Sequence, residues 1–158
     1  MKKDTYFASS FRNGWPEPKE LEPYFLGPPE RRWFFETRND GAILTAEGAE
    51  GTEHFDPNDR RRINIYLDMN GHPEHGVLLI YRKWGGGYKE TYNSMGDLSR
   101  LTEHVRSMHG TPLPVGLFIP FERAWSAVKE FMETDGKLPK SIDWIEDSKL
   151  PPEAFPGP

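Results

Sequence analysis

The feature that most constrains the fold is the segment 120–145, in which a complete helix is followed directly by a strand. Pro120 suits the first helical position, because the N–H that proline lacks has no partner there. Gly136 can adopt the left-handed conformation that commonly ends a helix just past its last turn, and Pro139 prevents the helix from resuming. We therefore predict a helix over 121–135 that packs on a sheet. Its apolar stripe consists of Phe121, Ala124, Trp125, Val128, Phe131 and Met132.

The sheet is predicted from short apolar or alternating segments that are separated by turn residues. The run 77–84 is almost continuously apolar and indicates a strand in the middle of the sheet. We read 47–60 as a polar loop, and Asn70-Gly71 as the start of a loop through His75. An antiparallel meander is the most economical arrangement. The predicted strands are 33–37, 42–46, 62–69, 77–84, 88–93, 115–119 and 142–144.

Two further segments complete the predicted architecture. Asp97 resembles the N-cap of a second helix over 97–108, with apolar residues on one stripe. Residues 1–30 are rich in proline, so we expect an arm packed on the core, with about one turn of helix at 17–24. The prediction is a single α+β domain over 31–158 plus this arm, with a mainly antiparallel sheet packed on one face by two α-helices.

Composition excludes several classes of protein. The formal net charge is −5 in 158 residues, which argues against an independent nucleic-acid binder and suits a basic protein partner. There is no cysteine, so disulfides and thiolate metal sites are impossible. The start of the chain lacks the apolar region of a secretory signal, and no apolar run is long enough to span a bilayer. We expect a cytoplasmic protein without a membrane partner.

No motif of catalysis or cofactor binding stands out, so we expect no enzyme activity, cofactor or metal. The three glycines 85–87 lead into a strand rather than a helix, which favours a hairpin turn over a phosphate-binding loop. The histidines of His72-Pro73-Glu74-His75 would come together only on a helix, and this segment reads as a loop. No nucleophile with a base and an acid is recognisable. A protein that works by binding is the interpretation that remains.

The segment from about Glu90 to Phe155 resembles the Imm1 family of bacterial immunity proteins. The resemblance lies in AWSAVKEFMETDGKLPKSIDWI, where a helix ends in Glu-Phe and is followed by a Thr-Gly-like turn, a proline and a closing strand with Trp. The matching residues are Ala127, Glu130, Phe131, Thr134, Gly136, Pro139 and Trp144. Two features depart from the pattern: Asp135 interrupts the Thr-Gly pair, and the first ~60 residues, judged by eye, match nothing in it. The resemblance implies that the chain binds and neutralises a toxin that acts on nucleic acid, typically of the cytidine-deaminase type.

For such a partner we predict a surface near the glycine hairpin. Aromatic anchors and carboxylates that attract a basic toxin would form it. An alternative is a small α+β enzyme or ligand-binding domain that uses acidic residues near Gly85–Gly87, and a third is a structural subunit of an assembly. The predicted partner-binding residues are Trp84, Tyr88, Glu90, Tyr92, Asp97 and Glu74.

Overall fold

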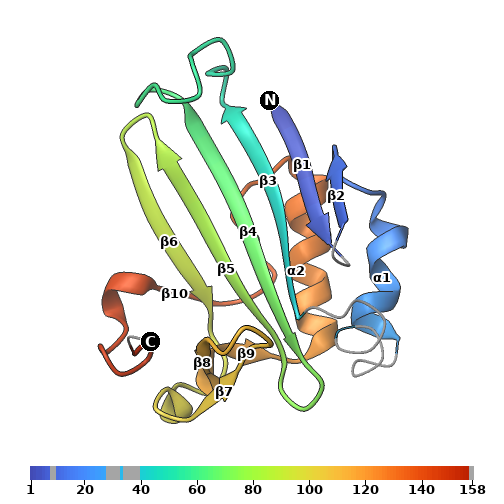
Figure 1. Ribbon diagram of the computed structural model, residues 1–158, viewed down its shortest axis with the longest axis vertical. Coiled ribbons are helices and arrows are strands. Elements are labelled where there is room, and N and C mark those ends of the chain that lie inside the picture. Colours follow the sequence, from blue (N-terminus) through green and yellow to red (C-terminus); the bar gives the residue numbers. More distant parts are fainter. Residues whose placement is uncertain (8–9, 28–32, 34–39, 157–158) are drawn as a thin grey trace.

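The computed structural model describes residues 1–7, 10–27, 33 and 40–156. Within this part of the chain, eight strands form one sheet in the order β10-β6-β5-β4-β3-β1-β2, with β9 added beside β5 (Figure 1). Every described pair of neighbouring strands is antiparallel, and β3 to β6 form the predicted meander. The strands of this sheet are β1 (Lys2–Phe7), β2 (Ser10–Asn13), β3 (Gly41–Ala49), β4 (Ile63–His72), β5 (Gly76–Gly85), β6 (Tyr88–Ser94), β9 (Phe118–Ile119) and β10 (Trp144–Glu146).

The strands β3 and β4 extend further than the sequence suggested. The predicted loops at 47–60 and 70–75 are wrong at their starts, because pairing continues to Ala49 and to His72. Residue 71 lies within β4 and is a glycine because any larger side chain would collide with Trp33. An added Cβ would lie 2.2 Å from the indole. The predicted strand 33–37 lies, apart from the buried Trp33, outside the described residues.

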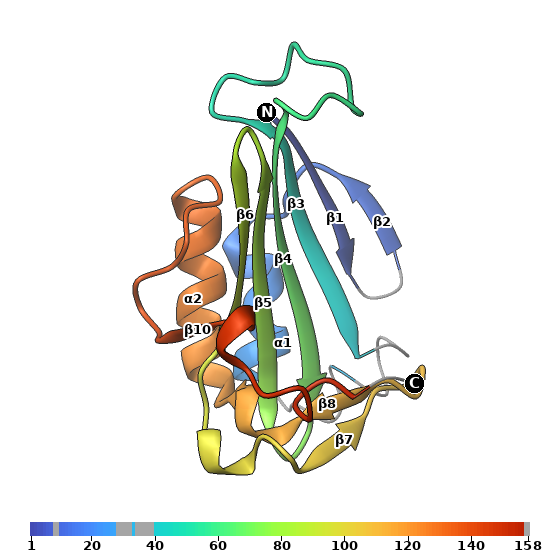
Figure 2. The same ribbon diagram turned by 90° about the vertical axis from the view of Figure 1, so that its left-hand side faces the viewer.

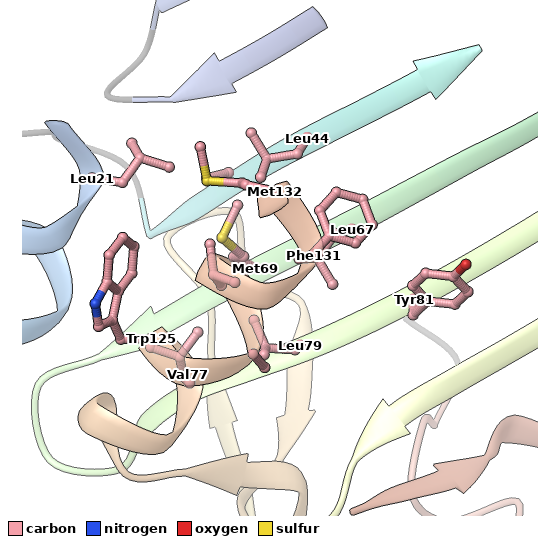
Figure 3. Packing of buried hydrophobic residues seen from close by; sticks show 14 of the residues in the cluster. Leu21, Leu44, Leu67, Met69, Val77, Leu79, Tyr81, Trp125, Phe131 and Met132 are labelled. Carbon is pink, nitrogen blue, oxygen red and sulfur yellow. The ribbon is translucent and has the colours of Figure 1, made fainter. Parts of the chain in front are cut away.

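Two helices, α1 (Pro18–Leu26) and α2 (Phe121–Glu133), cover the same face of the sheet (Figures 1 and 2). The predicted stripe of α2 faces the sheet, where Phe131 is completely buried and Trp125 is 7% exposed. Phe25 of α1 contacts Trp125, with ring centroids 5.4 Å apart. Figure 3 shows Trp125 and Phe131 of α2 on the side of the sheet that carries Leu44, Leu67 and Leu79. The predicted α+β fold with two helices on one face is confirmed, although the helix beside α2 is α1 and not the predicted segment 97–108.

The N-terminal segment supplies part of both layers. Strand β1 pairs with β3, and its Thr5 and Phe7 are buried on the helix side. The turn of helix predicted at 17–24 is the longer helix α1, and the ring of Trp15 lies 5.1 Å from that of Phe131. The division of the chain at residue 30 stays a prediction.

The predicted helix at 97–108 is wrong. Asp97 does cap a turn, since its carboxylate accepts a hydrogen bond from Ser99 N at 3.0 Å, but the turn is a 3₁₀ helix of three residues, Leu98–Arg100. The chain then forms β7 (His104–Arg106) and β8 (Pro112–Pro114), which pair as a hairpin closed by Ser107–Gly110. The apolar spacing over 97–108 does not mark a buried helix face, because the first and last residues of the stripe are exposed. Leu98 is 39% and Met108 48% exposed. The predicted strand 115–119 is a 3₁₀ turn, Val115–Leu117, followed by β9.

The second face of the sheet is only partly covered. At the end near the β4–β5 turn, Leu78 and Ile80 pack against Leu113, Leu117 and Phe118 from the β8–β9 region. Strand β5 is therefore buried on both faces over Gly76–Tyr81, which explains its continuous apolar sequence. Neither described helix has the length and apolar character needed to cross a bilayer.

Candidate partner-binding site

The site is built on the β5–β6 hairpin, whose turn depends on glycine. The central residues Gly86 and Gly87 both have positive φ, as a two-residue type I′ turn requires. Gly85 also has φ +95°, and an added Cβ would lie 1.9 Å from Arg62 O. Gly86 N donates to Arg60 O at 2.8 Å, which fixes the turn against the chain that enters β4. The predicted hairpin turn is confirmed, and it holds two exposed aromatic residues next to it, Trp84 and Tyr88.

The hairpin residues lie on two faces of the sheet. Tyr88, Glu90 and Tyr92 alternate along β6 on the side of the helices, where Tyr92 lies opposite the buried Tyr81. Trp84, which pairs with Lys89, lies on the other face and is 46% exposed. Four of the six predicted residues are therefore gathered on one hairpin, although not on one face.

A groove of about 460 Å³ lies along the outer edge of β6 and is lined by residues from both faces. We call it the edge groove. The short 3₁₀ turn Asp147–Lys149, directly after β10, forms its second wall. Glu146 and Asp147 belong to the groove and were missed from sequence, because only the pairing of β10 with β6 brings them there. The residues that line it are Trp84, Lys89, Glu90, Thr91, Tyr92, Glu146, Asp147 and Ser148.

The edge groove has an excess of negative charge. Glu90, Glu146 and Asp147 form no ion pair with any described residue within 4 Å, and Lys89 is the one cationic residue in the lining. Burial raises the pKa of the Tyr92 hydroxyl, and the nearby charges of Glu90 and Glu146 raise it further. Both carboxylates therefore lie close enough to Tyr92 to influence its hydroxyl.

Two other acidic residues near the hairpin, Glu50 and Asp59, are neutralised by neighbouring cations. Glu50 pairs with Lys83 at 2.7 Å, and the Lys83 ammonium also lies 3.8 Å from the centre of the Tyr88 ring. Asp59 pairs with Arg61 at 2.7 Å. Hydrogen bonds from the side chain and the backbone N–H of Arg61 lower the pKa of Asp59 to about 2. The charges of these two carboxylates are compensated within the protein, unlike those of the edge groove.

The other two predicted residues lie far from the hairpin. Glu74 is exposed in the β4–β5 turn, at the opposite end of β5 (Figure 1). Ten residues of strand separate the two ends by about 30 Å. Asp97 follows the end of β6 that is remote from the glycine turn, and its carboxylate is occupied by Ser99, whose hydrogen bonds lower the pKa of Asp97. The structure does not bring Glu74 or Asp97 to the edge groove.

The expectation that His72 and His75 would meet only on a helix is wrong. Their ring centroids lie 4.7 Å apart across the tight β4–β5 turn, and both rings approach Phe118. Burial, followed by the proximity of His75, lowers the pKa of His72. In the part of the chain that the structure describes, no three His, Asp or Glu side chains are grouped so that they could hold a metal ion.

A second hollow, of about 540 Å³, lies on the sheet face opposite the helices. Its best candidate for chemistry is Asp68, because burial raises the pKa of this carboxyl. The guanidinium of Arg82 opposes that rise and forms an ion pair with Asp68. The Asp68 carboxylate is thus bound by the Arg82 guanidinium, and we interpret the two residues as a structural ion pair rather than a catalytic group.

The residues behind the family resemblance form a structural clamp at the end of α2. The Glu130 carboxylate accepts hydrogen bonds from Lys140 N at 2.7 Å and from Ser141 N at 3.0 Å. Trp144 Nε1 donates to Pro139 O at 2.8 Å, and Tyr81 donates its hydroxyl hydrogen to Gly136 O at 2.8 Å. Asp135 and Gly136 both have positive φ, so the inserted Asp135 adopts the same left-handed turn as the glycine.

One comparison with known proteins finds a family whose model covers the clamp. A family model described as "Immunity protein Imm1" matches residues 36–146, which include β3 to β6, α2 and β10. The match begins after α1, so β1, β2 and α1 lie outside it. Comparisons with curated proteins and with solved structures found no significant match.

Proposed function

Because the chain belongs to the Imm1 family of immunity proteins, we propose that it neutralises a toxin of the cytidine-deaminase type by binding it and covering its active site. A toxin that binds nucleic acid needs a basic groove, because contacts between its Lys and Arg side chains and the phosphates supply most of the affinity. The observation that supports this partner is the set of uncompensated carboxylates in the edge groove, beside the exposed Trp84. The protein acts on its partner in the cytoplasm and does not itself bind nucleic acid.

The physical role of each side chain follows from its exposure and charge. Exposed carboxylates steer a basic partner and raise the association rate, whereas aromatic side chains that become buried in the complex slow dissociation. Trp84 and Tyr88 serve as anchors, and Glu90, Glu146 and Asp147 provide the field. The protein contributes no turnover of its own.

Titration of toxin activity tests the function directly. A candidate cytidine-deaminase toxin domain is assayed for deamination of DNA while increasing amounts of the protein are added. Activity should fall in proportion to added protein and reach zero at a ratio of one to one. Full activity at saturating protein would refute the immunity assignment to this toxin, and complete inactivation by a small fraction of an equivalent would indicate an enzyme instead.

Charge reversal tests how the two proteins find each other. Glu90→Lys should slow association several-fold and leave thermal unfolding almost unchanged, because Glu90 has no ion pair to lose. Glu74→Lys is the matched control, since it makes the same change about 30 Å away. Raising the salt concentration should slow the wild type too, because the range of the field falls to about 8 Å near physiological ionic strength. Equal slowing by both variants would mean that net charge, rather than the edge groove, steers the toxin.

A further inference from the structure

Strand β6 is covered along only part of its outer edge. β10 pairs with Tyr92, Asn93 and Ser94 and then turns away into the 3₁₀ helix at Asp147. From Tyr88 to Thr91, β6 pairs with β5 on one side, and no strand of the described chain lies on the other (Figure 1). This stretch of edge is the one along which the edge groove runs.

The direction of the backbone groups on this edge follows from two independent observations. Met95 N donates to Asp143 O at 3.1 Å, so the backbone N–H of Met95 points outward, away from β5. Backbone groups alternate along a strand with a period of two residues, so the N–H and C=O groups of Thr91 and Lys89 point outward as well. At the other end, Gly85 pairs with Tyr88 across the two-residue turn, so Tyr88 points its N–H and C=O inward. Both give the same phase, with Lys89 presenting its N–H and C=O to the groove.

We propose that an extended segment of the toxin pairs with β6 along Tyr88–Thr91 and continues the sheet beyond the end of β10. This inference rests on the proposed function and specifies how the partner is held. Backbone hydrogen bonds to an open edge supply affinity, and side-chain pockets on alternate sides supply specificity. On the helix side the segment meets Glu90 and Tyr92, which select a Lys or Arg. On the other side it meets Lys89 and Thr91 of β6, with Trp84 of β5 behind them in the same groove, and the indole selects an apolar residue long enough to reach it.

Charge favours this occupant over a second copy of the same chain. Two β6 edges that paired through both Lys89 and Thr91 would place Glu90 directly opposite its counterpart. Like charges in directly opposed positions destabilise a strand pair. The carboxylates of Glu146 and Asp147 at the end of the groove would add to the repulsion. A segment with basic side chains avoids this cost and compensates the same carboxylates.

Hydrogen exchange with the same toxin domain tests the proposal on the wild-type protein. The Lys89 amide should exchange at least about tenfold more slowly in the complex, because it gains a backbone acceptor. The amide of Glu90, which already faces β5, is the internal control and should change little. Unchanged exchange at Lys89 in a complex that neutralises the toxin would overturn the edge pairing and leave the immunity function intact. Failure of the wild type to bind would overturn both.

A proline variant provides the second measurement. Lys89→Pro removes the outward N–H and should weaken toxin binding by about tenfold or more, while β5–β6 pairing persists because edge strands tolerate proline. Lys89→Ala keeps the N–H and removes the one cation in the groove lining, so it should bind the basic toxin at least as tightly as the wild type. If both variants bind equally well, the segment does not pair with the backbone. If Lys89→Pro does not fold, the exchange result on the wild type decides.

Discussion

Replacing Glu130 with Gln should destabilise the protein in a way that depends on pH. The carboxylate accepts two backbone hydrogen bonds, from Lys140 and Ser141, and so ties the end of α2 to the loop before β10. Gln keeps one acceptor oxygen and loses the charge. Hydrogen bonds to charged groups contribute about 1.5–3 kcal/mol each, and water can reach this loop, so the lower end of that range applies. We expect a loss of about 1–2 kcal/mol near neutral pH.

The pH dependence follows from the pKa of Glu130. Burial opposes ionisation, but the hydrogen bonds from Lys140 and Ser141 outweigh it and lower the pKa below its ordinary value of 4.5. A carboxyl whose pKa is lowered by folding contributes stability that is complete above the pKa of the unfolded chain. That contribution is lost as the pH falls through the pKa of the folded protein. The wild type and Glu130→Gln should therefore differ most above about pH 5 and converge in acid.

Urea unfolding of both proteins at several pH values measures this difference. Glu133→Gln is the matched control, because Glu133 lies on the same helix, is exposed and forms no ion pair with the described residues. The control should remain within about 0.5 kcal/mol of the wild type. A difference for Glu130→Gln that is the same at pH 7 and in acid would show that its charge does not hold the loop.

Three other substitutions test the packing and the site. Phe131→Ala should cost about 3–5 kcal/mol in urea unfolding, whereas Phe11→Ala, at a residue that is 66% exposed, should cost little; equal losses would contradict the core. Gly85→Ala should destabilise more than Gly87→Ala, because both have positive φ but only Gly85 would place a Cβ against Arg62 O; equal melting temperatures would refute that contact. Trp84→Ala should speed dissociation from the toxin and barely change unfolding, and an unchanged dissociation rate would remove Trp84 from the interface.

The parts of the fold that sequence predicted correctly are those with local signals. Helix α2 has a proline at its start, a left-handed turn at its end and a regular stripe between them. The strands of the meander alternate, and β5 has the continuous apolar sequence of a strand that is covered on both faces. Turn residues between them set the order, so the antiparallel arrangement followed without knowledge of long-range contacts.

The errors arose where distant contacts override local pattern. The spacing of Leu98, Leu101 and Val105 suits a helix, but Leu101 and Val105 instead pack on the small core beneath β7 and β8. β1 gave no clear signal because its buried side depends on pairing with β3, about forty residues away. The acidic wall of the edge groove was missed for the same reason, since only the position of β10 places Glu146 and Asp147 beside Tyr92.

The residues of the family pattern and the residues of the edge groove are different sets that are linked through β10. Glu130 fixes the loop at Lys140 and Ser141, Trp144 Nε1 binds Pro139 O within that loop, and Trp144 is the first residue of β10. The end of β10 in turn decides how much of β6 remains uncovered and where Glu146 and Asp147 lie. The clamp therefore positions the proposed binding surface.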